Sequence, residues 1–509
     1  MTLLFIARHF TYFRNYDSVL RELARRGHRI HLAVEQDDKV GGARAIERLA
    51  AGHPGITTGF IPARRVDTWS AVARRLRLGL DYLRYLDPFY DAAPLRRERA
   101  RLRTPRLLTA LATPPLVGGR RWRRGYGRLL HAIDRIVPPP EAIVDFIRQQ
   151  APDAMVITPL VDLGSQQIDY VRAARLLRVP SGAAIWSWDH LTSKALLREY
   201  PERVFVWNET QRGEAVGTHG VPPDRVVVTG AQCFDHWFDR RPSRTRRQLC
   251  EALGLREDRP IVLYVCSALI KGSPPEVDFV REWAHWVRGS GDPLLASANL
   301  LIRPHPQYAA SWHDARLDAA GPVAVWGGNP IDEASRADYF DSLYHSAAVV
   351  GLNTSAFIEA GIVGREVLAV LAPGFHDNQE GTEHFRYLLQ IGGGLLRLGR
   401  DRAAHLAQLG AALRQPPVAG HRHRAFLESF VRPHGLDRAA TPVLADAIEA
   451  LPACQVEAAV VAAPWKRAVF GRLLQGVSRL LGDSLVRSPR ELAPERLARI
   501  AEAERRDRA

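Results

Sequence analysis

Residues 347–370, AAVVGLNTSAFIEAGIVGREVLAV, are the stretch that decides the fold of this chain. The apolar run Ala347–Leu352 has the length of a buried strand, and it stops at the polar triplet Asn353–Ser355, which suits the start of a helix. The helix is expected to end at Gly364, and the apolar run Val367–Leu371 predicts the next strand. A strand, a helix and a strand in so few residues form a parallel βαβ unit. The first turn of such a helix offers free backbone N–H groups and a partial positive charge, so it is predicted to bind a phosphate.

A second buried strand ends in a rigid polar segment at residues 299–307, NLLIRPHPQ. Pro304 and Pro306 hold His305 in an extended conformation directly after Arg303, because a residue that precedes proline avoids the helical region. A guanidinium and an imidazole fixed at a strand end suit phosphate oxygens through charge-assisted hydrogen bonds. The alternative is that His305 only caps the strand end.

Glu359 is the one carboxylate in a helix whose other residues are nearly all apolar. Such a helix is buried, and a buried carboxylate needs a partner. A capping box does not supply one, because the residues three positions after Thr354 and Ser355 are apolar. Glu359 lies one helical turn after the predicted phosphate-binding residues, and from there its carboxylate would accept hydrogen bonds from ribose hydroxyls. The alternative is a buried ion pair with Arg365.

The polar stretch His376–His384, HDNQEGTEH, follows the next strand, beside the predicted βαβ unit. Its place makes its central residues candidate ligand contacts, although polar loops with glycine are common. The predicted ligand contacts of this half of the chain are Arg303, His305, Asn353, Thr354, Ser355, Glu359, Gln379, Glu380, Gly381 and Thr382.

Strands and helices alternate twice along the 509 residues, which are too many for one ordinary core. The first series predicts a parallel α/β domain over residues 1–238. A fresh strand at Ile261 starts the second series, which predicts a Rossmann-like domain over about 255–415. Residues 416–509 are predicted to form a helical tail.

Polar and aromatic residues also follow two strands of the first series. One group comes directly after the first strand, and the other is the loop Trp186–His190 with Lys194. Ligands gather at the C-terminal ends of strands in an open parallel sheet, so both groups are expected at one edge. Two tryptophans beside acidic and basic groups suit stacking on a second substrate. The candidates on this side are Arg8, Tyr12, Trp188, His190 and Lys194.

An arginine-rich insert occupies about residues 64–137. From Arg64 to Arg135 it holds eighteen arginines and six acidic residues, so most of the net charge of +15 lies there. Interleaved aromatic and leucine side chains suit a membrane surface or a polyanionic acceptor. A solvated helical face is the alternative. Nucleic acid is not expected as a partner, because no recognised binding motif accompanies the arginines.

The compartment follows from what the sequence lacks. The start has no basic region before its apolar run, and no apolar stretch is long enough to span a bilayer. The four cysteines lack metal-site spacing, so no metal is expected. They also show no disulfide framework, so we expect a reducing compartment. Residues Ala463–Gly482 predict an amphipathic helix that either packs on the first domain or lies in a membrane interface. We expect a cytoplasmic protein, peripheral to the inner face of the plasma membrane.

With these motifs, the chain resembles glycosyltransferases of the GT-B type, in which two Rossmann-like domains face a central cleft. It is most similar to the group of CDP-glycerol glycerophosphotransferases and bacterial surface polysaccharide transferases. The resemblance rests on the Arg-Pro-His-Pro run at 303–306 and on Thr354 and Ser355 with Glu359. It implies that His305, Thr354 and Ser355 contact the phosphates of a nucleotide-activated donor, UDP- or CDP/CMP-linked. No cofactor is expected, because cationic side chains and a helix terminus can stabilise the phosphates.

The expected reaction moves a sugar or polyol phosphate from this donor to a hydroxyl acceptor of a bacterial surface polysaccharide or glycolipid, which can be lipid-linked. His305 would stabilise the departing phosphate, and a base would deprotonate the hydroxyl. His9 is the first candidate for that base, then Asp189, then Asp162. The alternatives are an enzyme like the non-hydrolysing UDP-sugar 2-epimerases and a nucleotide-binding homologue without catalysis.

Overall fold

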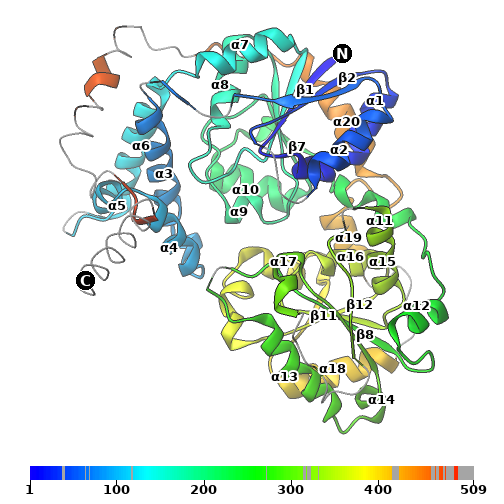
Figure 1. Cartoon of the computed structure of the whole chain (residues 1–509). Coiled ribbons are helices and arrows are strands. Elements are labelled where there is room, and N and C mark those ends of the chain that lie inside the picture. Colours follow the sequence, from blue (N-terminus) through cyan, green and yellow to red (C-terminus); the bar gives the residue numbers. More distant parts are fainter. Residues whose placement is uncertain are drawn as a thin grey trace, which may run out of the picture.

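Two parallel α/β domains make up most of the molecule (Figure 1). The structure is a computed structural model that describes residues 1–36, 41–62, 65–67, 69–115, 118–270, 272–312, 317, 323–330, 332–414, 423–459, 465, 469–473, 476 and 487–490. Each domain has a parallel sheet with helices on both faces, as the alternation of strands and helices predicts. The predicted fold class is therefore confirmed.

The sheet of the first domain has seven strands in the order β3-β2-β1-β4-β5-β6-β7, all paired in parallel. The strands are β1 (Thr2–Ala7), β2 (Arg29–Val34), β3 (Ile56–Phe60), β4 (Ala154–Thr158), β5 (Ser181–Ala184), β6 (Arg203–Val206) and β7 (Val226–Val228). β1 and β4 are buried at nearly every residue, as expected of strands covered on both faces. The strand order reverses between β1 and β4, and such a switch point is where open α/β sheets bind ligands.

The sheet of the second domain repeats this arrangement with six strands in the order β10-β9-β8-β11-β12-β13. They are β8 (Ile261–Val265), β9 (Asn299–Arg303), β10 (Val323–Val325), β11 (Ala348–Gly351), β12 (Glu366–Val370) and β13 (Leu396–Gly399). The switch point lies between β8 and β11. The polar segments of both quoted stretches lie at this sheet edge. β9 ends at Arg303, and β11 ends at Gly351, two residues before Asn353.

Helices cover the two faces of each sheet. The first domain has α1 (Asp17–Arg25), α2 (Gly42–Ala51), α7 (Glu141–Gln150), α8 (Ile168–Leu176), α9 (His190–Ser193) and α10 (Glu209–His219), and the connecting helix α11 (Asp235–Asp239) packs on the second domain through Trp237. The second has α12 (Arg246–Leu253), α13 (Glu276–Arg288), α14 (Pro293–Ala296), α15 (Glu333–Tyr344), α16 (Ala356–Ile362), α17 (Glu383–Gln390), α18 (Arg402–Arg414) and α19 (Arg424–Phe430).

The C-terminal segment does not form a separate tail throughout, because the chain crosses back to the first domain. α20 (Ala440–Glu449) lies against α1, with Leu444 and Ile448 in the core beside β1 and β2. Arg26 also pairs with Glu449, at 2.6 Å. Most of the predicted amphipathic helix over 463–482 lies outside the described residues, which here are 465, 469–473 and 476.

The arginine-rich insert is a four-helix unit beside the first domain (Figure 1), made of α3 (Ser70–Arg84), α4 (Pro94–Arg103), α5 (Arg106–Ala112) and α6 (Arg120–Ile136). Its inner arginines are buried in ion pairs. Arg77 is fully buried and pairs with Asp169 at 2.6 Å and with Asp134 at 3.1 Å. Arg198 of the first domain pairs with Asp81 of α3 at 2.5 Å. A solvated face therefore does not describe this side of the insert, which docks through buried charges that need their partners.

Candidate functional site

The carboxyl ends of the two sheets lie in the same region of the molecule, and side chains of both domains meet there. The Trp188 ring lies 4.7 Å from the His384 ring, between the centroids. The Tyr387 hydroxyl of the second domain donates to Glu214 of α10. Arg14, in the 3-10 helix η1 (Phe10–Tyr16) after β1, is close enough to act electrostatically on His305 and Glu359. The two switch points therefore share one interdomain region.

His305 lies half-buried at the end of β9, as the two prolines predict. The backbone N–H of Gln307 donates to its Nδ1 at 3.3 Å, so the proton of the neutral ring belongs on Nε2. Burial lowers the pKa of His305 below its usual value, and the nearby Arg14 guanidinium adds to this. A neutral imidazole with an Nε2–H donor suits a phosphate oxygen.

Arg303 is held inside the second domain. Its guanidinium donates to the Ser342 hydroxyl at 3.0 Å and stacks on the Tyr339 ring, 4.7 Å from the centroid. It also packs against Gly327, where an added Cβ would lie 2.4 Å from the guanidinium carbon. The side chain is 4% exposed, so Arg303 fixes Tyr339, and its contact with a phosphate stays a prediction.

The partner of Glu359 is the hydroxyl of Tyr339, which donates to Oε2 of the carboxyl group. The alternative of an ion pair with Arg365 is wrong, because Arg365 lies over the Tyr344 ring, 5.1 Å from its centroid. Burial raises the pKa of Glu359 to about 7, although the Tyr339 hydrogen bond and the Arg14 charge oppose the rise. Glu359 therefore changes charge near neutral pH.

The polar triplet after β11 has the predicted place at the start of α16, and the segment ends at Gly364 with φ +73°. Asn353 donates to the Asn378 carbonyl at 2.6 Å and so joins this turn to the next loop. The Thr354 hydroxyl accepts from Ala356 N–H at 3.3 Å, and Ser355 is exposed. Ser355 has the more open hydroxyl for a ligand.

The loop after β12 divides into structural and exposed residues. Gln379 is fully buried, and its amide group bonds the main chain at Leu352, Val370 and Ala372 at 2.9–3.2 Å. It therefore positions the ends of β11 and β12 and offers no amide donor to a ligand. Thr382 is also buried and donates to the Gln379 carbonyl, and an added Cβ at Gly381 would lie 2.8 Å from Asp377 Cα. Glu380 is more open and lies 3.8 Å from His376.

A row of rings crosses the carboxyl ends of β1 and β5 in the first domain. The His9 ring lies 4.4 Å from Tyr12, Tyr12 lies 5.3 Å from Trp186, and Trp186 lies 4.6 Å from His190, all edge to face. Burial lowers the pKa of His190 to about 4, so this ring stays neutral. Trp186 Nε1 and His190 Nδ1 are buried and have no hydrogen-bond partner among the described residues. These polar atoms suit a hydroxyl-bearing ligand.

Arg8 and Asp162 form an ion pair at 3.0 Å that joins the ends of β1 and β4 at the first switch point. Glu35, at the end of β2, lies close enough for both charges to act on it. Burial raises the pKa of Glu35 to about 7, while Arg8 opposes the rise. A second carboxyl group that titrates near neutral pH therefore lies at this edge.

Asp189 is held as an anion, which makes it a weak base. It accepts hydrogen bonds from the hydroxyls of Ser187 at 2.6 Å and Ser193 at 2.5 Å. Burial opposes ionisation, but the charges of Lys194 and His384 outweigh it and hold the pKa of Asp189 well below its usual range. A base needs a pKa nearer the working pH.

The insert holds the loop that carries Asp189. Arg84 donates to the Ala195 carbonyl at 2.8 Å, the Tyr85 hydroxyl donates to the Lys194 carbonyl at 2.6 Å, and Arg96 donates to the Thr192 carbonyl at 3.1 Å. Trp188 is 7% exposed and packs with the core of the second domain. Trp186 is therefore the more open indole of this loop, and Trp188 joins the domains.

Three residues of this region were not among the sequence predictions. Glu35 directly follows an apolar strand, and that position was a usable signal. Arg14 and Tyr339 gave none, because their relation to Glu359 comes from the approach of separate segments.

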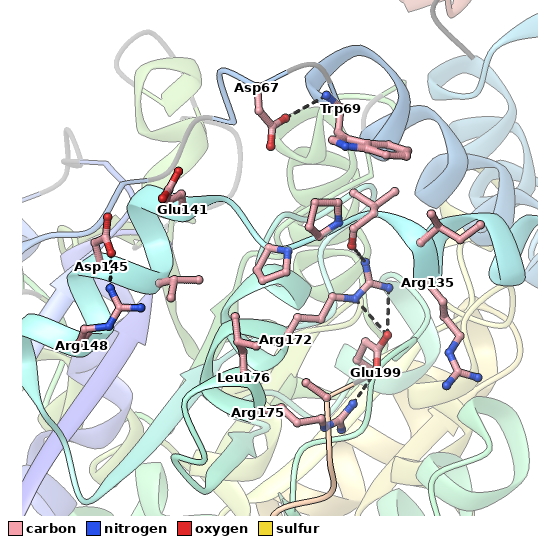
Figure 2. A pocket seen from close by; sticks show the side chains of 16 residues that line it. Asp67, Trp69, Arg135, Glu141, Asp145, Arg148, Arg172, Arg175, Leu176 and Glu199 are labelled. Atoms are coloured by element: carbon pink, nitrogen blue, oxygen red, sulfur yellow. Dashed lines mark hydrogen bonds and ion pairs between the residues drawn. The ribbon is translucent and has the colours of Figure 1, made fainter. Parts of the chain in front are cut away.

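A cavity of about 610 Å³ lies elsewhere, on the flank of the first domain between the insert, α7 and α8 (Figure 2). Figure 2 shows Arg172 and Arg175 converging on Glu199. Arg172 Nε and an Arg175 guanidinium nitrogen each donate to a Glu199 carboxylate oxygen at 3.0 Å. Its lining residues include none of the predicted site residues. Within the described part of the chain, no group of three or more His, Cys, Asp and Glu side chains could hold a metal ion. The same part of the chain has no helix with the length and apolar character that a bilayer span requires.

No protein-family model and no curated protein matches this sequence. Solved structures are similar in fold at low identity. The UDP-GlcNAc 2-epimerase from Neisseria meningitidis bound to UDP-GlcNAc is 12% identical, with 88% of this chain and 100% of that chain covered and a TM-score of 0.49. The calicheamicin glycosyltransferase CalG4 is 13% identical, covering 88% and 98% with a TM-score of 0.44. The Anabaena protein HepE in complex with UDP is 11% identical, covering 94% and 99% with a TM-score of 0.44.

Proposed function

We propose that this chain is a transferase of the GT-B type, which moves a sugar or polyol phosphate from a nucleotide-activated donor to a hydroxyl acceptor. The observation that carries the proposal is that the switch points of the two sheets face one interdomain region and present different side chains to it. The second domain brings His305 and Glu359 to its sheet edge. The first brings the rings of Trp186 and His190, whose Nε1 and Nδ1 have no hydrogen-bond partner among the described residues. Two edges suit two substrates.

The donor binds at the second domain. The Nε2–H of His305 and the open hydroxyl of Ser355 contact phosphate oxygens, while the carboxylate of Glu359 accepts hydrogen bonds from ribose hydroxyls. Arg14 comes from the first domain and adds positive charge where the leaving phosphate becomes more negative. The departing group is thus stabilised from both domains.

The acceptor binds at the row of rings in the first domain. Its hydroxyl loses a proton to a base as it attacks the donor. His9, at the end of β1, keeps its place as the first candidate, and Glu35 replaces Asp189 as the second because of its pKa near 7. The motif resemblance supports an acceptor from surface polysaccharide or glycolipid synthesis.

The first test is a thermal-shift panel of UDP, CDP, CMP, GDP and TDP. At least one nucleotide is expected to raise the melting temperature of the wild type, and His305→Ala is expected to reduce that rise. Gln307→Ala is the matched control, because its exposed side chain lies in the same segment. If no nucleotide stabilises the wild type, the proposal fails. If His305→Ala keeps the full shift, only the role of His305 is lost.

Product analysis then separates a transferase from an epimerase. A transferase releases a free nucleotide and needs an acceptor, whereas an epimerase returns a sugar that is still activated. Nucleotide binding without either product would identify a homologue that binds but does not catalyse.

A further inference from the structure

One face of the insert carries arginines that no acid compensates. Arg121, Arg124, Arg128 and Arg135 follow one another on α6 at intervals of three, four and seven residues, so they form a stripe along the helix. All four are exposed. None has an acidic side chain within ion-pair distance in the described part of the chain.

The distribution of acids explains why this face stays positive. α5 and α6 together hold seven arginines and one acid, Asp134. Asp134 is fully buried and already pairs with Arg77 and Arg172. The inner face of the insert is therefore neutralised, while the outer face has no counter-charge of its own.

Large apolar side chains lie beside the stripe. Trp122 is 39% exposed and Leu129 is 57% exposed on α6, and Leu111 of α5 is 40% exposed. The Trp122 indole donates to the Leu111 carbonyl at 2.7 Å, which joins the two helices and holds the ring at the surface. Leu102 of α4 is also 40% exposed. An exposed leucine side chain is hydrated unfavourably in water, and its free energy falls when it enters a lipid interface.

Described residues of the C-terminal segment add to the apolar surface near the insert. Val469 is 56% exposed and Leu473 is 59% exposed. Between them, Gly471 approaches the Trp69 ring at the start of α3, where an added Cβ would lie 3.4 Å from the ring. Apolar groups from two distant parts of the sequence thus lie beside the insert.

We propose that the outer face of α5 and α6 docks on an anionic lipid bilayer. The arginine stripe meets the negative headgroups, and Trp122, Leu129 and Leu111 enter the interface. Nucleic acid would satisfy the arginines but would leave the leucines in water. This docking goes beyond the proposed reaction. It would place the interdomain region near the membrane, because Arg96 of the same insert lies 3.4 Å from His384 there.

The test is co-sedimentation of the full chain with vesicles of phosphatidylcholine alone or of phosphatidylcholine with phosphatidylglycerol. The wild type is expected to bind the anionic vesicles only, and high salt is expected to weaken binding. The triple variant R121Q/R124Q/R128Q should bind about a hundredfold more weakly, since each arginine near an anionic surface strengthens binding by about fivefold. Leu129→Gln should weaken binding by several-fold.

The matched control is R241Q/R247Q/R400Q, which removes the same charge from exposed arginines outside the insert. It should bind vesicles like the wild type, and both triple variants should keep the wild-type melting temperature. Equal losses in the two triple variants would overturn the proposal, because net charge alone would then explain binding. Failure of the wild type to bind anionic vesicles would also overturn it. So would binding to single-stranded RNA that the α6 triple variant loses while vesicle binding is unchanged.

Discussion

Tyr339→Phe removes the hydroxyl that donates to Glu359 and leaves the rest of the ring in place. The ring keeps its contact with Arg303, so the second domain should fold as before. The buried carboxyl group then lacks its donor, which costs about 1–3 kcal/mol of stability. In a domain of this size, the melting temperature should fall by about 3–10 °C.

The same change should move the pH dependence of nucleotide binding. Glu359 has a pKa of about 7, and its hydrogen bond from Tyr339 holds that pKa down. Loss of a hydrogen bond to a carboxylate should raise the pKa by about one unit, since one unit corresponds to about 1.4 kcal/mol. The carboxylate is the form proposed to accept from ribose, so affinity should rise with pH through about 7 in the wild type. In the variant the rise should come about one unit higher.

Isothermal titration with the nucleotide that gives the largest thermal shift measures this effect across pH. At pH 7 the variant should bind about fivefold more weakly, because the ionised fraction falls from about a half to about a tenth. At high pH the two proteins should converge. Tyr344→Phe is the control, because Tyr344 lies in the same helix and its hydroxyl has no hydrogen bond among the described residues. An equal loss of affinity at every pH would refute the role given to the Glu359 carboxylate.

Three further predictions concern the scaffold. Gln379→Leu leaves main-chain groups of the second domain without partners, so thermal melting should occur about 5–10 °C lower, and an unchanged melting temperature would contradict the role given to Gln379. Arg77→Met removes the close partner of the buried Asp169 and leaves it only the Arg65 guanidinium at 3.8 Å, which should cost about 3–5 kcal/mol in chemical denaturation, whereas a cost below about 1 kcal/mol would show that the insert docks without the Arg77 pair. Burial raises the pKa of Glu214 to about 8, so its contribution to stability is present below pH 4.5 and is lost as pH rises through 8. Glu214→Gln keeps an acceptor for Tyr387 and should flatten this loss in melting curves recorded against pH, and an unchanged curve would contradict the assignment.

The fold was predictable because each strand and helix has a local pattern. The alternation of apolar runs with amphipathic helices predicts two parallel α/β units, and both are present. The return of α20 to the first domain was not predictable. The apolar face of α20 predicts that the helix is buried, but Leu444 and Ile448 could pack on any core of similar shape. Specific polar contacts select the first domain, among them Arg26 with Asp446 and Glu449, and His28 with Glu449.

The candidate site was predictable where one segment fixes its own geometry. Two prolines place His305, and an apolar helix with one carboxylate draws attention to Glu359. The partner of that carboxylate was not predictable, since Tyr339 lies twenty residues away on α15. Gln379 is predicted as a ligand contact because it is a polar residue in a polar loop. In the structure its amide group instead forms hydrogen bonds with the backbone.

The insert connects features that the sequence presents as separate. Arg84 and Arg96 hold the loop of Asp189, and Arg96 also reaches His384 of the second domain. The outer face of the same unit is the proposed membrane surface. A change in how the insert lies on the first domain must therefore move the loop of Asp189 and the interdomain contact together, because one four-helix unit carries the membrane face on α5 and α6, Arg84 on α3 and Arg96 on α4. Membrane docking and acceptor binding are for this reason expected to be coupled, and the coupling should be lost when Arg96 is replaced while the arginine stripe is kept.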